Sequence, residues 1–322
     1  MRGVVQALPE RGPMELGSRA RLPVHCHYAD CSGVRLGPGF GRIVRRGYFY
    51  RTSDSRQIAR FRCQVCKRSF SQASSSSCFR QKRRNLNAPL RLLLVSGVSQ
   101  RRAARILHAN RKTIVRKFLF LALRSELRQR HFVDSLRHRQ SKISAIQFDE
   151  MESFEHSKCK PISIPLVVLP KQRKILALDV CQMPAKGPLA SLSRRKYGPR
   201  PDERAGAARQ LLSLLREALA EHPEVLTDQK PQYPFWLAQA LGPVEHRQVE
   251  GRRGCVVGQG ELKRGGFDPL FSLNHTAAQI RANVNRMFRR TWCTTKRRDR
   301  LRAHLMLYAD FHNRELTPAL AD

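Results

Sequence analysis

The chain has 322 residues and a formal net charge of +36, because 61 lysine and arginine residues outnumber 25 aspartate and glutamate residues. This length allows two or three domains, and a hydrophobic content of 41% is enough for a buried core. So many positive charges repel one another unless a polyanion offsets them, and nucleic acid is the usual polyanion. No apolar run is long enough to span a membrane, and the N-terminus lacks the apolar centre of a signal peptide. We expect an intracellular protein whose nine cysteines are metal ligands or buried thiols rather than disulfides.

The first cysteines in the chain form two closely spaced pairs. Cys26 and Cys31 make one pair, and Cys63 and Cys66 make a second pair about thirty residues later. Two such pairs are typical of a tetrahedral zinc ribbon with a hairpin between them. The alternative is four unrelated thiols. A four-cysteine site has no open coordination position, so it predicts structural Zn²⁺ that supports folding and binding rather than catalysis.

After a serine-rich, basic linker, the sequence becomes helical in its periodicity. A first helix is expected to end near Gly97, Ser99 is a good N-cap for a second helix, and a break at 108–110 precedes a third, basic helix. This arrangement is typical of a helix-turn-helix. The alternative is an ordinary three-helix bundle with a solvated basic face. The candidate DNA contacts, whose types reach phosphates and base edges, are Arg111, Lys112, Thr113 and Arg116.

Two short apolar runs end in an aspartate, one at Asp149 and the other at Asp228. Carboxylates among many cationic neighbours are what a divalent metal ion acting on a phosphodiester would need. Taken singly, Asp149 could instead cap a turn at the end of a strand, and Asp228 could cap the segment that follows it. Nearby alternative acids are Glu150, Glu152 and Glu155.

The element order around these aspartates predicts a fold. In chain order we expect strands ending at Asp149 and covering 162–169 and 174–180, a loop over 183–205, a helix over 207–222, strands over 224–228 and 244–250, and a helix over 275–292. This is the order of a ribonuclease-H-like fold, in which the first and fourth strands would bring Asp149 and Asp228 together. We therefore predict an α+β multidomain protein with a mixed sheet in its α/β core. The predicted division is a disordered N-terminus at 1–22, a zinc ribbon at 23–72, a basic linker at 73–85, a helix-turn-helix domain at 86–123, a connector helix at 124–142, a ribonuclease-H-like catalytic domain at 143–313 and a tail at 314–322.

The chain resembles insertion-sequence transposases of the DDE superfamily over nearly everything from Cys26 to about Asn313. The motifs that carry the resemblance are FRCQVCKRSFS, FDEMESFEHSKCKP, LTDQKPQYP, GQGELKRGGFDPLFSLNHTAAQIRANVNRMFRRTWCTTK and YADFHN. The resemblance implies that Asp149 and Asp228 are the first two acids of a site for two Mg²⁺ ions, with Mn²⁺ able to substitute. Such ions activate water and then a DNA 3′-hydroxyl for attack on phosphodiesters.

The third acid of the family is replaced in this sequence. The family places it at the start of the last helix, seven residues before a basic residue, and here Asn274 is expected to open that helix with Arg281 following on the same face. Asn274 is therefore the positional equivalent, unless it is only a helix cap. A neutral amide oxygen should bind Mg²⁺ more weakly than a carboxylate. The alternatives are His275, Glu261 or Asp268 as the ligand, or an inactive copy.

The same helix is predicted to offer a basic surface to DNA phosphates. Its alternative interpretation is a solvated charged face, although apolar residues supply a side for burial. Four further cysteines lack pair spacing and are expected to be buried thiols: Cys159, Cys181, Cys255 and Cys293. The candidate phosphate contacts are Arg281, Arg289, Arg290 and Lys296.

The predicted function is that of a transposase that binds terminal inverted repeats and catalyses metal-dependent DNA cleavage and strand transfer. The expected partners are double-stranded DNA at the element ends and the target, with homo-oligomers in the DNA complex and no membrane. The expected location is the cytoplasm, in association with the nucleoid. Two alternatives remain: a catalytically decayed copy that only binds DNA, and a ribonuclease-H-like nuclease without strand transfer.

Overall fold

The computed structural model describes residues 22–32 without 24, 43–74 without 53 and 54, 76–250, 268–288 and 291–317. The chain divides into two compact units, Met1–Leu86 and Asn87–Asp322. Within the described residues, no helix combines the length and the apolar character that crossing a membrane requires. The predicted disordered N-terminus at 1–22 falls almost wholly outside the described residues.

The first unit contains a three-stranded antiparallel sheet in the order β1-β2-β3. Phe61 and Phe70 pack together in its small core, with ring centroids 5.7 Å apart, and cysteines complete this core. So little apolar surface is a weak driving force for folding, and domains of this kind commonly depend on a metal. The elements are β1 (Ile43–Arg51), β2 (Arg56–Cys63), β3 (Ser69–Ser71) and the 3₁₀ turn η2 (Arg84–Leu86).

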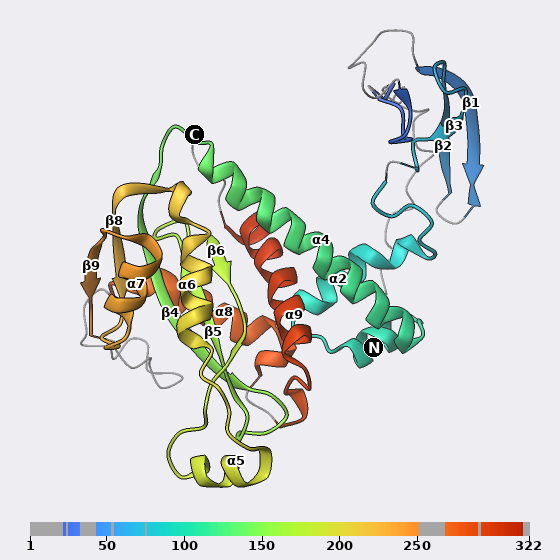
Figure 1. The fold of residues 1–322 in the computed structure, drawn as a ribbon. Helices are drawn as coiled ribbons and strands as arrows, with labels where there is room; N and C mark the ends of the chain where they lie inside the picture. The colour runs from blue at the N-terminus through green and yellow to red at the C-terminus, as the bar shows by residue number, and fades with distance from the viewer. Residues whose placement is uncertain are drawn as a thin grey trace, which may run out of the picture. The chain divides into compact units, whose positions relative to one another are not determined.

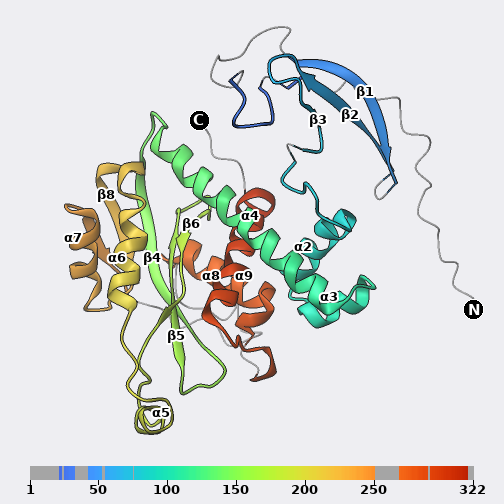
Figure 2. The same ribbon diagram turned by 45° about the vertical axis from the view of Figure 1, so that its right-hand side comes forward.

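The second unit begins with three helices whose ends follow local signals (Figure 2). Gly97 has a φ of +76° in the first turn, and the Ser99 side chain accepts a hydrogen bond from the Arg102 amide at the next helix start. The last helix continues through the predicted boundary at 123/124 without a break, because its apolar face extends from Ile114 to Leu136. The helices are α2 (Asn87–Val95), α3 (Gln100–Ile106) and α4 (Arg111–Arg137).

A six-stranded mixed sheet forms the centre of the second unit. Five strands follow the order β6-β5-β4-β8-β9, and the short β7 pairs with β5. β5 is antiparallel to both β4 and β6, whereas β8 is parallel to both β4 and β9. The predicted α+β class with a mixed sheet is therefore confirmed. The strands are β4 (Ile143–Phe154), β5 (Pro161–Val168), β6 (Ile175–Leu178), β7 (Cys181–Gln182), β8 (Leu219–Thr227) and β9 (Glu245–Gln248).

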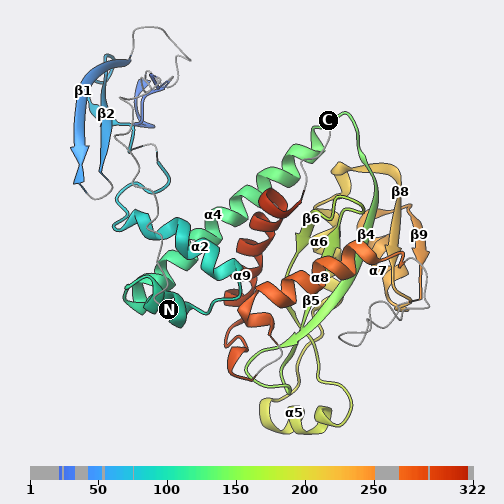
Figure 3. The ribbon, with the colours of Figure 1, turned by 180° about the vertical axis from the view of Figure 1, so that it is seen from behind.

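Helices cover both faces of this sheet (Figures 1 and 3). Alternate residues of β4 and β5 point into two separate cores, as the two-residue period of a strand requires. One core contains α6, α7 and the end of α4, and the other contains α2, α3, the start of α4, α8 and α9. The helices not yet bounded are α5 (Leu189–Tyr197), α6 (Arg204–Ser213), α7 (Tyr233–Leu241), α8 (Phe271–Asn283) and α9 (Arg298–Phe311).

Four predicted elements differ from the structure. The strand expected to end at Asp149 continues to Phe154, because β4 pairs with β5 along that whole length. The helix expected over 207–222 ends at Ser213, and Leu219 belongs instead to β8, where it pairs with Ile143. The loop expected over 183–205 contains α5. The helix expected over 275–292 begins at Phe271 and ends at Asn283. Short turns surround these helices: η3 (Arg216–Ala218), η5 (Asn285–Met287), η6 (Thr291–Cys293) and the π-helical η7 (His312–Leu316).

Candidate metal-binding sites

The four N-terminal cysteines form one cluster, with all sulfur atoms within 4.8 Å of one another. The sulfurs of Cys26 and Cys66 are 3.7 Å apart, and those of Cys31 and Cys63 are 3.8 Å apart. These separations are too long for disulfides. They match the edge of a tetrahedron of sulfurs around Zn²⁺, which is about 3.8 Å for a Zn–S distance of about 2.3 Å. The cluster could therefore bind a structural metal such as zinc.

Asp149 and Asp228 come from two paired strands of the central sheet. β4 and β8 are parallel, and Gln147 is the register partner of Leu226. Asp149 and Asp228 each follow two residues later, so the pairing brings them to the same level of the sheet. Burial, followed by the negative charge of Asp228, raises the pKa of Asp149 to about 7. Burial also raises the pKa of Asp228. Two mutually repelling, half-desolvated carboxylates are a donor set that a divalent cation would stabilise.

Tyr233, at the start of α7, contacts the first of these acids. Its hydroxyl donates a hydrogen bond to Oδ1 of Asp149 at 2.9 Å, and the backbone amide of Glu150 donates to the same oxygen at 2.6 Å. Burial, and then the charge of Asp149, raise the pKa of Tyr233, so this hydroxyl stays a donor. The tyrosine thus orients one carboxylate oxygen and leaves the other for a cation.

Glu150 lies beside the same site but already has partners. It forms an ion pair with Lys230 and accepts a hydrogen bond from Ser163 at 2.6 Å, and its side chain is only 4% exposed. Burial lowers the pKa of Lys230. Glu152 is exposed and pairs with Lys186 over 3.0 Å. Glu155 lies further along the chain, where it bridges to Thr295.

The start of α8 is fastened to β4 next to the candidate acids. The buried Gln147 donates from Nε2 to the carbonyl of Pro269 at 2.7 Å and accepts from the amide of Leu273 at 2.9 Å. Gln147 and Asp149 share the face of β4 that points toward α8, since they are two residues apart. Arg281, on α8, lies close enough to lower the pKa of Asp149 in opposition to burial.

The candidates for a third ligand lie in the first turns of α8. Asn274 does not open the helix as predicted, because α8 begins at Phe271 after Asp268 has accepted a hydrogen bond from the Leu270 amide at 2.9 Å. Asn274 is exposed, and its amide donates to Oδ2 of Asp268 at 2.9 Å. His275 contacts Arg173 instead, with nitrogens 3.3 Å apart. Glu261 lies outside the described residues.

The predicted DNA contacts are distributed over several places. Arg111, Lys112 and Arg116 are exposed in the first turns of α4, and Thr113 is half-buried. Lys296 is exposed and contacts His156. Arg289 and Arg290 lie outside the described residues. The remaining cysteines also partly follow the prediction: Cys159 and Cys181 are buried, Cys293 is half-buried, and Cys255 is not described.

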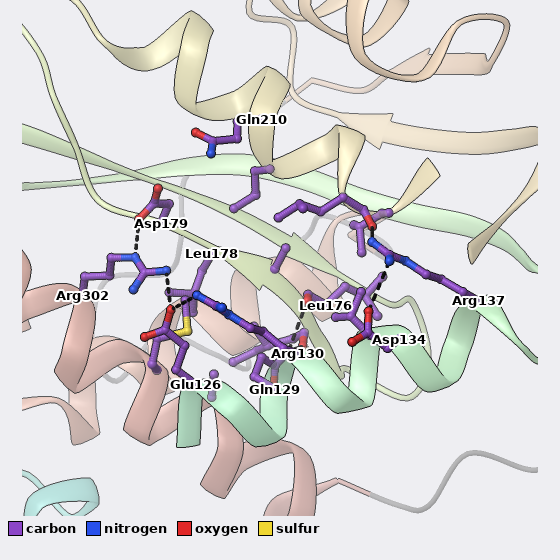
Figure 4. A pocket seen from close by; sticks show the side chains of 18 residues that line it. Glu126, Gln129, Arg130, Asp134, Arg137, Leu176, Leu178, Asp179, Gln210 and Arg302 are labelled. Carbon is purple, nitrogen blue, oxygen red and sulfur yellow. Dashed lines mark hydrogen bonds and ion pairs between the residues drawn. The ribbon is translucent and has the colours of Figure 1, made fainter. Parts of the chain in front are cut away.

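A cavity of about 390 Å³ lies between α4, β6, α6 and α9 (Figure 4). Leu176 of the edge strand β6 belongs to its apolar lining. The charged side chains around it pair with one another, as Arg302 does with Glu126 and Asp179. Neither candidate acid lines the cavity, and its charges leave no convergent group for a ligand, so we assign no function to it.

Sequence reasoning missed three residues that build the candidate site: Gln147, Lys230 and Tyr233. Gln147 could have been predicted from the sequence, because it is a polar residue within an apolar run and lies two residues before Asp149, on the same face of the strand. Lys230 and Tyr233 follow Asp228 within five residues, but their approach to β4 depends on the pairing of β8 with β4. No protein-family model matches the chain, and no curated protein matches it.

Proposed function

We propose that the chain is a DDE-type insertion-sequence transposase with a ribonuclease-H-like core. The observation that carries the proposal is the juxtaposition of Asp149 and Asp228 on paired parallel strands, with one carboxylate raising the pKa of the other. The strand order β6-β5-β4-β8-β9, in which β5 runs opposite to each strand that it pairs with, supports such a core. The net charge of +36 supports a polyanionic substrate.

The side chains have distinct roles in the proposed reaction. Asp149 and Asp228 would hold the metal, and further oxygen ligands would come from Asn274 on α8 and from its partner Asp268, just before that helix. Tyr233 fixes the rotamer of Asp149. Two Mg²⁺ ions, or Mn²⁺ in their place, would activate water and then a DNA 3′-hydroxyl for in-line attack on phosphodiesters. Arg281 offers positive charge to the DNA beside Asp149.

The rest of the chain would recognise the element ends. The cysteine cluster would stabilise the small sheet of the first unit through Zn²⁺, and α3 with the start of α4 would contact duplex DNA. The exposed side chains of Arg111, Lys112 and Arg116 support this role. The protein would act in the cytoplasm on nucleoid DNA, as a homo-oligomer that joins two element ends.

A decayed copy that only binds DNA is the second candidate. The observation that favours it is Asn274, a neutral side chain where the family has a carboxylate, because a neutral ligand weakens metal binding. A nuclease without strand transfer would use the same acids but would yield no joined product.

Cleavage of a duplex that carries the element's own terminal repeats tests the proposal. The parent protein should nick this duplex at the repeat boundary with Mg²⁺ or Mn²⁺ and then join the new 3′-hydroxyl to a second duplex. Asp228→Asn should abolish nicking while repeat binding stays unchanged. Binding without nicking in either metal would instead support the decayed copy, and nicking without joining would support the nuclease.

A further inference from the structure

The segment between β7 and α6 carries α5 beyond the end of the sheet, as Figures 1 and 3 both show. Hydrogen bonds fasten it to the turn that joins β4 and β5. The buried hydroxyl of Ser193 donates to the carbonyl of Cys159 at 2.7 Å, and Arg200 donates to the carbonyl of Pro161 at 3.1 Å. The ammonium of Lys160 lies 4.8 Å from the ring centroid of Tyr197. α5 is therefore a docked helix with a fixed orientation on the hairpin.

A third segment joins the same turn from far along the chain. The amide of His156 donates to the carbonyl of Thr295 at 2.8 Å, and the ammonium of Lys296 lies 2.8 Å from Nδ1 of His156. We call residues 156–160, 183–200 and 295–297 together the basic arm.

The basic arm has a strongly positive net charge. Its three segments include nine lysine and arginine residues and no aspartate or glutamate. Arg194, Arg195 and Lys196 are consecutive and exposed on α5. Within the described residues, neither Arg194 nor Arg195 has an ion-pair partner, whereas many other arginines of the second unit do. Lys186 and Arg297 pair with acids outside the arm, Glu152 and Asp299, so the consecutive basic residues of α5 carry the argument. Such a docked cluster on a protruding helix is the electrostatic counterpart of a phosphodiester backbone.

The strand geometry relates this arm to the candidate acids. β4 continues for five residues from Asp149 to Phe154, which is about 17 Å at about 3.3 Å per residue. That length is about half of a helical turn of duplex DNA, which rises about 34 Å. A duplex with one phosphodiester at the acids can therefore present its flanking backbone to the arm.

We propose that the basic arm binds the backbone of duplex DNA, independently of sequence, on one side of the bond held at Asp149 and Asp228. This proposal rests on the proposed function for the position of the DNA, and it adds a contact that neither the cysteine cluster nor α3 and α4 provide. An arm that contacts phosphates only would suit DNA whose sequence varies, such as a target or the flank of an element.

Binding by full-length Arg194→Gln/Arg195→Gln tests the arm. A matched control, Arg209→Gln/Arg216→Gln, removes the same charge from exposed positions of α6 and η3. Two lost phosphate contacts should make the negative slope of log affinity against log salt shallower by about 1.8. The factor by which affinity falls between about 50 and about 200 mM salt should therefore be about twelvefold smaller than for the parent. The control should keep the parent slope. Equal slopes for parent and arm variant, or equal reductions in both variants, would overturn the proposal.

Two further measurements locate the contact. Extending a repeat duplex by a helical turn past the cleavage point should strengthen binding by the parent and the control, but not by the arm variant. Equal gains in all three proteins would contradict the placement. Vesicles with anionic headgroups serve as a competing polyanion, and an arm variant impaired only on vesicles would reject DNA as the ligand. These measurements report binding and do not depend on metal-dependent nicking. A parent protein that loses DNA binding on the arm substitutions but does not nick DNA would overturn the proposed activity and leave the proposed arm contact intact.

Discussion

The hydroxyl of Tyr233 donates a hydrogen bond to Asp149 over 2.9 Å, from a helix that begins five residues after Asp228. The short segment between β8 and α7 therefore connects the two candidate acids. Asp228 follows the end of β8, and Tyr233 at the start of α7 donates a hydrogen bond to Asp149. The ring of Tyr233 also packs edge-on against Phe148, with centroids 4.9 Å apart, and is fully buried. The tyrosine is both a core residue and the partner of a carboxylate.

Tyr233→Phe should separate these two roles. The ring packing remains, so the protein should lose only the hydrogen bond, which is worth about 2 kcal/mol of folding stability when its acceptor is a charged carboxylate. That bond stabilises the charged form of Asp149, so its loss should raise the pKa of Asp149 beyond its present value of about 7. The acid limb of the pH profile of the cleavage rate should then move to higher pH, because protons compete with the metal ion for the carboxylate of Asp149. An unchanged pH profile would show that Tyr233 has a packing role only.

Changes at Asn274 should alter the metal requirement. Asn274→Ala removes an oxygen ligand and also the amide that holds Asp268. The Mg²⁺ concentration for half-maximal cleavage should rise about tenfold, equivalent to about 1.4 kcal/mol. Repeat binding in the absence of metal should not change. His275→Ala is the matched neighbour, because its ring contacts Arg173 instead, and it should keep the parent requirement. The reverse result would assign the ligand to His275.

Local signals predicted part of this molecule well. Gly97 and Ser99 mark the end of one helix and the start of the next because a positive φ and a capping side chain act within a few residues. Asp149 and Asp228 could be predicted as candidate acids because each ends an apolar run. These runs form β4 and β8, which are neighbours in the sheet. The closeness of the four cysteines also follows from their spacing.

Long-range pairing decided the rest. Leu219 has helical spacing from Leu211 and Leu215, yet it pairs with Ile143 in the sheet, and no local pattern reveals that partner. α5 was missed because proline and glycine surround it, while its docking depends on Cys159 and Ser193, which are distant in sequence. The start of α8 also differs from the prediction because of a long-range contact. Gln147 on β4 forms hydrogen bonds with Pro269 and Leu273, and α8 begins at Phe271 rather than at Asn274.

Removal of one cluster cysteine should remove the metal. Cys63 is buried at the end of β2, and its replacement by serine takes a thiolate from a tetrahedral set. Cys63→Ser should contain nearly no zinc by elemental analysis and should bind element ends more weakly, because the small sheet loses the free energy of metal binding. Cys78→Ser, outside the cluster, should keep one zinc per chain. Full zinc content in Cys63→Ser would reject a four-cysteine site.

A buried histidine should make the second unit sensitive to acid. His304, on α9, donates through Nε2 to the carbonyl of Leu94 on α2 at 2.9 Å, and its ring packs against Phe118 of α4. Burial lowers the pKa of His304 to about 4. The unfolded chain, with a pKa near 6.5, therefore binds more protons between pH 4 and 6.5, and stability falls as the pH falls through that window.

The expected loss from this group is about 3.4 kcal/mol across the window, from about 2.5 pKa units at about 1.36 kcal/mol each. Urea unfolding at pH 7 and at pH 4.5 measures most of it, about 2.7 kcal/mol over about two units. His304→Leu should lower stability at pH 7, because the carbonyl of Leu94 loses its donor, but should show a shallower fall toward pH 4.5 than the parent. His131→Leu, which changes an exposed histidine of α4, should keep the parent slope. Parallel falls in the parent and His304→Leu would show that other groups, rather than this imidazole, control the response to acid.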